Sequence, residues 1–373
     1  MSILQPAFKI LTICGCWMPV SCRAVYAKAL YNLYTTLVLF LLYVFCISQL
    51  LNVILNVRMV DELSDSFYMF IASFLACCKI VALLINRKAI RTLSKKLEEE
   101  PCKPTNVQEL VIQRQFDQSI GYRSITIWYT IVVEFTVLCM ILCSFVTDFA
   151  NRKLTYRAWL PFNYSLPNYY YVTYFHQIVA LIGTSLVNVA CDVIVCGLFV
   201  HMCSQLEILK HRLKGIVEET KPDIGRIVRF HDYLYGYAST VLQKFKEVIG
   251  IQLLSSTLVV CFIFYELANA PLMSSRFLQF VLYLICMMTQ IFFYCWYGDQ
   301  LKVKSVEVVD AIFEMDWLCL DISSRKSLLN IARRAIIPIE LTCAYIFTMS
   351  LKTVVSILKM SYSTYNLLQR TNA

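Results

Sequence analysis

Seven long runs of apolar residues divide this 373-residue chain, and they constrain its fold more than any other feature. A membrane-spanning helix needs about 20 consecutive, mainly apolar residues. Because 58% of the residues are hydrophobic and only 16% are charged, a soluble domain of this size is excluded. We therefore predict an all-α, polytopic membrane protein with one domain over residues 1–373. The predicted spans are 30–55, 67–86, 124–147, 172–200, 247–268, 275–297 and 339–361.

The positive charges predict the orientation of these spans. Lys and Arg residues lie mainly before the first span and between spans two and three, four and five, and six and seven. Because loops rich in Lys and Arg stay in the cytoplasm, we predict a cytoplasmic N-terminus and, with seven spans, an extracellular C-terminus. The net charge of +9 is explained by these loops, so nucleic acid is not an expected partner.

Cysteine and histidine spacing gives no sign of a metal site or of an enzyme. The 17 cysteines follow no disulfide or zinc pattern, and the four histidines have no ligand spacing or partner nucleophile. We therefore predict no catalytic residue, no metal and no cofactor. One sequon, beginning at Asn163, lies in a loop predicted to be extracellular, which makes Asn163 a candidate for glycosylation.

Two segments predicted to be cytoplasmic are amphipathic. Leu206, Leu209 and Leu213 recur at helical spacing within 203–246, and a similar stripe runs through 298–337. Spans four, five and six are therefore predicted to continue as helices below the membrane. Their apolar stripes must be buried, either within one chain or between subunits, which favours a cytoplasmic anchor bundle with an oligomer interface.

Charged residues inside the apolar runs need partners, because an unpaired charge in a bilayer is costly. Lys79 in span two and Glu134 in span three are expected at comparable depths. A structural ion pair between them is the simpler interpretation, and a direct role in ligand or ion binding is the alternative. Asp192, near the inner end of span four, is expected at the membrane interface.

Span seven carries a polar stripe along one helical face. A stripe of this kind faces water or a polar interior rather than lipid. Several copies arranged in a ring would enclose a pore, and the alternative is packing against polar groups of neighbouring spans. Lys352 conflicts with a cation pore made of identical subunits, unless it turns aside. The stripe consists of Thr348, Lys352, Ser356, Lys359, Ser363, Asn366 and Arg370.

Two motifs near the C-terminus resemble a known family. Residues 294–301 read Tyr-Cys-Trp-Tyr-Gly-Asp-Gln-Leu, and residues 356–363 read Ser-Ile-Leu-Lys-Met-Ser-Tyr-Ser. In insect odorant receptors a motif similar to the first ends span six, and a motif similar to the second lies in span seven. Residues 229–245 are similar to their second cytoplasmic loop. Length and topology extend the resemblance to the whole chain.

The resemblance implies a tetrameric, odorant-gated, non-selective cation channel in the plasma membrane of olfactory neuron dendrites. A tuning subunit there assembles with a shared co-receptor, spans four to six form a cytoplasmic anchor, and the seventh helix is broken into cytoplasmic and membrane parts. This chain lacks the long second cytoplasmic loop of the co-receptor, so it resembles a tuning subunit. The pore residues implied are Ser363, Asn366, Leu367 and Arg370.

The resemblance also implies a ligand site among the outer halves of spans two, three, four and six. The residues there are mainly apolar and aromatic, as in small-molecule pockets generally. A small, neutral, hydrophobic volatile is the expected ligand. The implied site residues are Phe67, Tyr68, Ile71, Leu138, Ile141, Tyr174, Gln177, Phe280, Tyr283 and Met287.

Other membrane proteins fit less well. A gustatory-type receptor channel is the nearest alternative, although Thr364-Tyr365 is followed here by Asn-Leu-Leu-Gln rather than by that family's apolar residues. A G-protein-coupled receptor would have the inverted orientation. A transporter usually shows internal repeats, which are not found in this sequence.

Overall fold

Nearly all of the chain that the computed structural model describes is helical. The helices are α1 (Gln5–Ile13), α2 (Val25–Asn56), α3 (Val60–Lys96), α4 (Val107–Gln118), α5 (Tyr122–Ser144), α6 (Pro167–Gly215), α7 (Ile224–Asn269), α8 (Ser275–Glu314), α9 (Ile322–Ala335) and α10 (Leu351–Asn372), and a π-helical turn (Phe145–Phe149) extends α5. The described residues are 4–19, 24–56, 60–97, 99–118, 122–164, 166–216, 223–272, 274–316, 319–340, 342–343 and 347–372.

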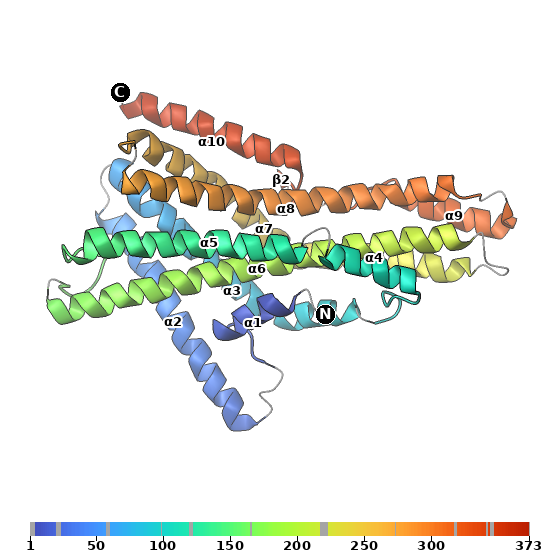
Figure 1. The fold of residues 1–373 in the computed structure, drawn as a ribbon, viewed down its shortest axis with the longest axis horizontal. Helices are drawn as coiled ribbons and strands as arrows, with labels where there is room; N and C mark the ends of the chain where they lie inside the picture. The colour runs from blue at the N-terminus through green and yellow to red at the C-terminus, as the bar shows by residue number, and fades with distance from the viewer. Residues whose placement is uncertain are drawn as a thin grey trace.

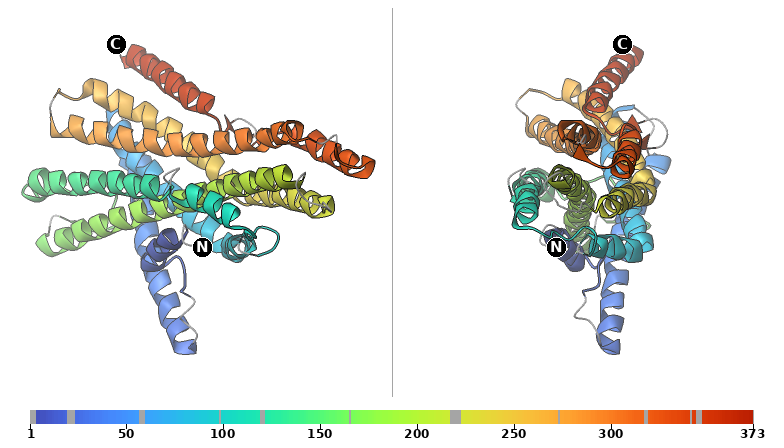
Figure 2. Two further views of the ribbon diagram at one scale, coloured as in Figure 1. Left: turned by 45° about the vertical axis from the view of Figure 1, so that its right-hand side comes forward. Right: turned by 90° about the vertical axis from the view of Figure 1, so that its right-hand side faces the viewer.

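The body of the molecule is a bundle of long helices. Helices α5, α6 and α8 run along its long axis (Figures 1 and 2), and α3 and α7 complete the bundle. Helix α6 packs against α8, α5, α3 and α7, so it is the central helix. Almost every residue from Val187 to Leu209 is buried. This fits its sequence, because a helix that is apolar on all sides belongs inside a bundle.

Six of the described helices are long and apolar enough to cross a membrane: α2, α3, α5 with its π-helical turn, α6, α7 and α8. Each contains one of the first six predicted spans, so the chain is a multi-pass membrane protein. Helix α6 has 49 residues and is about 74 Å long at ~1.5 Å per residue. Since a hydrocarbon core is about 30 Å thick, α6 extends well beyond it, as do α7 and α8.

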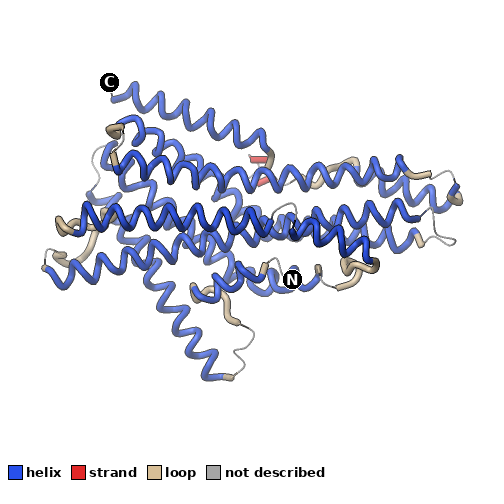
Figure 3. Tube along the Cα trace, in the orientation of Figure 1, coloured by secondary structure: helices blue, strands red, loops and turns tan. Residues whose placement is uncertain are grey.

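The predicted seventh span, 339–361, has the wrong bounds. Helix α10 begins only at Leu351, and a short antiparallel ribbon of β1 (Thr342–Cys343) and β2 (Phe347–Thr348) precedes it, pairing Thr342 with Thr348 (Figure 3). Proline cannot continue a helix, and Pro338 stands just beyond α9. β-Branched and aromatic residues then favour strands. The seventh helix is thus broken into α9 and α10, as the fold class predicted.

The N-terminal segment is attached to α2 and α3 by hydrogen bonds and by cation–π contacts. The Tyr31 hydroxyl donates to the carbonyl oxygens of Thr12 and Trp17, at 2.9 and 3.0 Å. The guanidinium groups of Arg87 and Arg91 lie 5.4 and 5.2 Å from the Trp17 ring centroid. The first half of α2 instead projects away from the bundle (Figure 1) and exposes apolar side chains, which suits contact with lipid.

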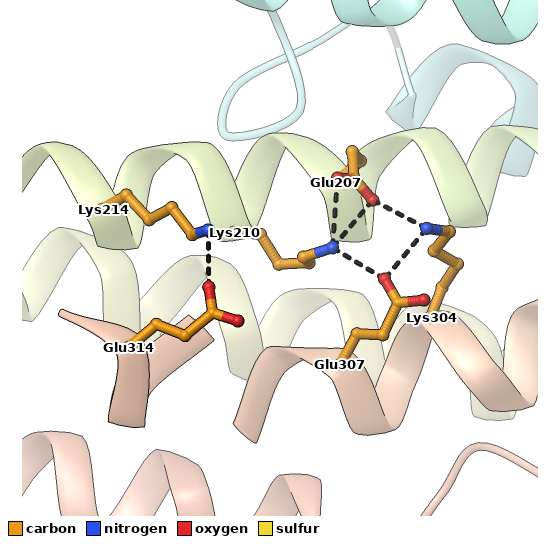
Figure 4. Close-up of polar contacts among 6 residues, drawn as sticks. All are labelled: Glu207, Lys210, Lys214, Lys304, Glu307 and Glu314. Atoms are coloured by element: carbon orange, nitrogen blue, oxygen red, sulfur yellow. Dashed lines mark hydrogen bonds and ion pairs between the residues drawn. The ribbon is translucent and has the colours of Figure 1, made fainter. Parts of the chain in front are cut away.

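Beyond the span-length part of the bundle, α6 and α8 are joined by a network of ion pairs (Figure 4). Lys210 Nζ lies 2.7 Å from Glu307 and 3.1 Å from Glu207 of its own helix. Lys304 Nζ lies 2.9 Å from Glu307 and 3.3 Å from Glu207. Four alternating charges stabilise one another more than an isolated surface pair would. They fix the register of α6 against α8 where both have left the apolar region.

Arg212 joins α4 to α6 at the same end. Its Nε and Nη2 atoms each lie 2.9 Å from the Glu109 carboxylate, in bidentate geometry. Burial alone would raise the pKa of Glu109, but the hydrogen bonds from Arg212 and from the Thr105 backbone N–H outweigh it and lower that pKa. Arg212 also donates to the carbonyl oxygens of Pro101 and Lys103. It therefore anchors the segment that enters α4.

Candidate functional site

A cavity of about 90 Å³ lies between α3, α5, α6, α7 and α8. Met69 of α3 and Tyr283 of α8 line it about two to three turns from the starts of their helices, near the end that carries the α5–α6 and α7–α8 connections. The lining is mainly apolar. It consists of Met69, Ile71, Ala72, Leu75, Tyr129, Val133, Thr136, Val137, Met140, Leu181, Thr184, Ser185, Asn188, Val189, Ser255, Val259, Tyr283, Cys286, Met287 and Gln290.

Helical periodicity explains how the chain forms this cavity. Residues three and four apart share one face of a helix. On α5 the lining residues Val133, Val137 and Met140 follow this spacing, and on α6 Leu181, Ser185 and Asn188 do so. One face of each helix is therefore directed at the same space, and the cavity is a property of packed faces rather than of loops.

The structure brings three of the predicted ligand residues into this cavity: Ile71, Tyr283 and Met287. Tyr68 and Phe280 lie next to it. The ring centroid of Tyr68 is 5.6 Å from that of Phe280 and 5.6 Å from that of Tyr283.

Tyr68 and Phe280 also line a second, outer cavity of about 950 Å³, bordered by the 148–160 loop and Arg276. Met140 lines both spaces. The aromatic cluster of Tyr68, Phe280 and Tyr283 thus stands between the outer cavity and the inner one. A ligand arriving from the outer end would pass these three rings.

Gln177 and Tyr174 support the wall of the outer cavity. The Gln177 side chain accepts a hydrogen bond from the Tyr156 backbone N–H at 3.2 Å and donates to its carbonyl oxygen at 2.9 Å. The Tyr174 hydroxyl lies 3.2 Å from Ser144 Oγ. Gln177 therefore holds the α5–α6 loop, on which Asn163 is exposed, and Tyr174 contacts the end of α5; neither lines the inner cavity.

Three other predicted ligand residues lie away from the inner cavity. Leu138 is 51% exposed on the outer side of α5, so its assignment to the site is wrong. Phe67 packs on Phe262 of α7, with ring centroids 5.2 Å apart. Ile141 is half-buried and packs against the core. Leu138 faces away from the bundle, whereas Phe67 and Ile141 lie four residues from the lining residues Ile71 and Val137 and pack beside the cavity.

The predicted Lys79–Glu134 ion pair is also wrong. Lys79 Nζ lies 2.5 Å from Asp192 Oδ1, whereas Glu134 accepts a hydrogen bond from Ser185 at 3.1 Å. Asp192, expected at the membrane interface, is only 3% exposed. The reason is geometric: α6 packs directly against α3 and brings Asp192 to the buried face of α3, which carries Lys79.

Asp192 is the centre of a polar cluster below the cavity. Its carboxylate accepts hydrogen bonds from the hydroxyls of Tyr294 and Tyr129 at 2.7 and 2.9 Å, and from Gln290 Nε2 at 2.5 Å. A buried carboxylate is tolerated only when it is paired and hydrogen-bonded in this way. Tyr129 and Gln290 also line the cavity, so the cluster forms its polar floor. Within the described ranges, no three His, Cys, Asp or Glu side chains converge on a possible metal site.

The polar stripe of α10 lies on the uncovered side of that helix. Lys352, Ser356, Lys359 and Ser363 are exposed, whereas Thr353, Ile357 and Ser361 are buried against the bundle. Ser361 Oγ donates to the Thr257 carbonyl oxygen of α7 at 3.3 Å. Leu367 is 63% exposed and Asn366 is half-buried. The side chain of Arg370 lies outside the residues that the structure describes.

Gly298, within the first C-terminal motif, lets the chain before α10 approach α8. A Cβ atom at this position would lie 2.5 Å from Met349 Cβ and 2.8 Å from the Met349 carbonyl oxygen. Only glycine avoids this overlap. The motif therefore has a packing role at the point where the broken seventh helix crosses α8.

Sequence reasoning missed the polar side of the cavity. Asn188, Tyr129 and Gln290 were not singled out, and Asp192 was placed at the interface. A usable signal exists, because Asn188 and Asp192 are four residues apart in an apolar run, as are Gln290 and Tyr294. Polar residues at that spacing mark one buried polar face.

Comparisons with known proteins agree with this architecture. A family model described as 7tm Odorant receptor matches residues 59–362. Odorant receptor 46a, isoform A, of Drosophila melanogaster is 25% identical over 350 residues, with 91% of each chain covered. Odorant receptor 9a of the same species is 22% identical, over 89% of this chain and 87% of the relative.

A solved structure shares the fold. The olfactory receptor OR5 from Machilis hrabei in complex with eugenol superposes with a TM-score of 0.89 at 20% identity, over 99% of this chain and 97% of that one. The superposition covers the helical bundle and the broken seventh helix together. Because the family model matches most of its length, this chain belongs to the 7tm odorant receptor family of insects.

Proposed function

We propose that this chain is the odorant-tuning subunit of an odorant-gated, non-selective cation channel. It would assemble as a heterotetramer with the odorant receptor co-receptor in the plasma membrane of olfactory neuron dendrites. The observation that carries the proposal is the mainly apolar cavity between the spans, which is lined by Ile71, Tyr283 and Met287.

The cavity suits a small neutral volatile. Apolar and aromatic side chains supply most of the lining, as in small-molecule sites generally. An odorant of about ten heavy atoms would have to widen the space of about 90 Å³. It would gain about 5–7 kcal/mol on binding, which corresponds to a dissociation constant of about 10–100 μM. Shifting a channel from 1:99 to 99:1 open takes about 5.5 kcal/mol of differential affinity. One such site would therefore open the channel only partly.

The uncovered polar face of α10 supports the pore assignment. A helix that leaves Ser356, Lys359 and Ser363 exposed on a membrane protein needs water or polar partners along that face. Four copies around an axis would supply both. Since Lys352 and Lys359 would crowd a pore of four identical chains with positive charge, a mixed assembly with the co-receptor is favoured.

Recording from cells that express the chain with and without the co-receptor tests the proposal. Odour-evoked cation current is expected only when both subunits are present and inserted at the surface. A robust current from the chain alone would refute the requirement for a co-receptor. Absence of any evoked current across a broad panel of volatiles, despite surface expression of both subunits, would refute the channel function.

A further inference from the structure

Two buried polar atoms of the cavity lining have no hydrogen-bond partner in the described part of the chain. They are Oδ1 of Asn188 on α6 and the hydroxyl of Tyr283 on α8. Three other polar side chains of the lining already have partners. Tyr129 and Gln290 donate to Asp192, and Ser185 donates to Glu134.

We infer that the cavity recognises a neutral odorant through a hydroxyl group, which donates to Asn188 Oδ1 and accepts from the Tyr283 hydroxyl. This inference rests on the proposed function, because it names the ligand class of that same cavity. It follows from the chemistry of the two unpartnered atoms. A buried polar atom left without a partner is costly, and a ligand that supplies the partner recovers that cost.

The donor and acceptor inventory separates the ligand classes. A carbonyl or ether oxygen only accepts, so it would satisfy Tyr283 and leave Asn188 Oδ1 unpaired. A hydrocarbon would leave both atoms unpaired. A hydroxyl donates and accepts at once, so it alone of these groups satisfies both atoms.

A charged ligand does not fit the same space. The lining is mainly apolar, and transferring an ionised ammonium or carboxylate into it is strongly unfavourable. The charges of Asp192 and Lys79 already neutralise each other at 2.5 Å, and the Glu134 carboxylate accepts the hydroxyl of Ser185. An alcohol or a phenol is therefore the ligand class that the cavity favours. Sites built to hydrogen-bond a hydroxyl reject analogues that lack it more strongly than apolar pockets reject a missing methylene.

Isomeric probes isolate the hydroxyl from size and hydrophobicity. The chain and the co-receptor are expressed together, and concentration–response curves are recorded for 1-hexanol against its isomer methyl pentyl ether, and for 4-ethylphenol against its isomer 4-methylanisole. In at least one pair, the hydroxyl compound is expected to act at about tenfold lower concentration, the effect of roughly one net hydrogen bond. In Tyr283→Phe and Asn188→Leu, that ratio should fall towards one, and surface labelling at matched total expression shows that the variants fold.

Each outcome decides a different question. Equal or greater sensitivity to the ether in both pairs would overturn the hydroxyl inference while leaving the channel intact. An unchanged ratio in both variants would also overturn it. If a variant responds to none of the four probes, the hydroxyl inference is judged from the response ratios of the isomers on the unsubstituted chain alone. Failure of all four probes and of a broad volatile panel, with both subunits at the surface, would overturn the proposed function and the inference with it.

Discussion

At the scale of single residues, Asp192 shows why charged side chains in apolar helices are informative. Asp192 lies where α6 contacts α3, α5 and α8. Its carboxylate accepts hydrogen bonds from Lys79, Tyr129, Tyr294 and Gln290. Three of these donors are neutral and one is charged, so the carboxylate is satisfied without leaving the interior. A cluster of this kind fixes four helices relative to one another directly below the candidate ligand cavity.

Removing the carboxylate should harm the protein more than removing its cationic partner. Asp192→Leu would strand a buried ammonium group and three donors, at a cost of about 3–5 kcal/mol for a broken buried pair. Lys79→Met would leave Asp192 with three hydrogen-bond donors, so a smaller loss is expected. Surface labelling at matched total expression measures the difference.

Glu134→Gln is the control for that comparison. The glutamine oxygen can still accept the hydroxyl of Ser185, so surface expression should stay close to that of the unsubstituted chain. A loss of surface expression at Glu134→Gln as large as that at Asp192→Leu would support the predicted Lys79–Glu134 ion pair and contradict the structure.

The inner cavity can be tested by filling it. Ile71→Trp adds bulk to a space of about 90 Å³, and should reduce odour sensitivity at least tenfold without loss of surface expression. The matched control is Leu138→Trp, because Leu138 is 51% exposed and lies outside the lining. Concentration–response recordings compare the two. If Leu138→Trp impairs the response more than Ile71→Trp, the site lies elsewhere.

The residue-level errors share one physical cause. Hydropathy and spacing set the depth of a residue in the membrane, and the predicted ligand residues Ile71, Tyr283 and Met287 line the inner cavity. They do not show which neighbouring helix each face meets. Leu138 and Glu134 were therefore placed at the right depth with the wrong surroundings. Asn188 was missed for the same reason, because the role of a single amide in an apolar run can be inferred only when the helix face that it meets is known.

At the scale of elements, the first six spans could be predicted because each is a long apolar run with polar ends. The seventh could not be placed correctly, because apolar content alone does not separate a helix from a short ribbon. Residues 342–343 and 347–348 lie inside this apolar run, yet they form the strands β1 and β2, and β1 packs against α7. What positions this segment is a tertiary contact, the close approach of Met349 to Gly298.

Gly298→Ala should therefore be destabilising, although alanine is the better helix former. Its Cβ would overlap Met349 at 2.5 Å, and overpacking typically costs about 1–3 kcal/mol. The control is Gly236→Ala on α7, where nothing lies within 4 Å of an added Cβ and helix propensity should gain up to about 1 kcal/mol. Thermal unfolding of the purified proteins in detergent compares them. Equal shifts in both variants would show that the close approach is unimportant.

At the scale of the whole molecule, one helix connects the candidate ligand cavity, the crossing with the segment before α10, and the ion pairs with α6. Helix α8 contributes Tyr283 to the cavity, Gly298 to the crossing with Met349, and Lys304 to the ion pairs with α6. A ligand that favours one packing of α8 could therefore bias α10 through the Gly298 contact. Such a bias needs only a difference in ligand affinity between two states of the bundle.

The central claim, that α10 lines a water-filled pore of an odour-gated channel, is tested most directly by cysteine accessibility on a matched pair of serines. Ser363 is exposed on the polar stripe, and Ser361, two residues earlier, is buried against α7. Each is replaced by cysteine, expressed with the co-receptor, and treated with a water-soluble thiol reagent during odour-evoked current, with the unsubstituted chain as the background. The account predicts rapid block of current in Ser363→Cys and in Asn366→Cys, with little change in Ser361→Cys. Faster modification at Ser361→Cys, or no block at either Ser363→Cys or Asn366→Cys, would contradict it.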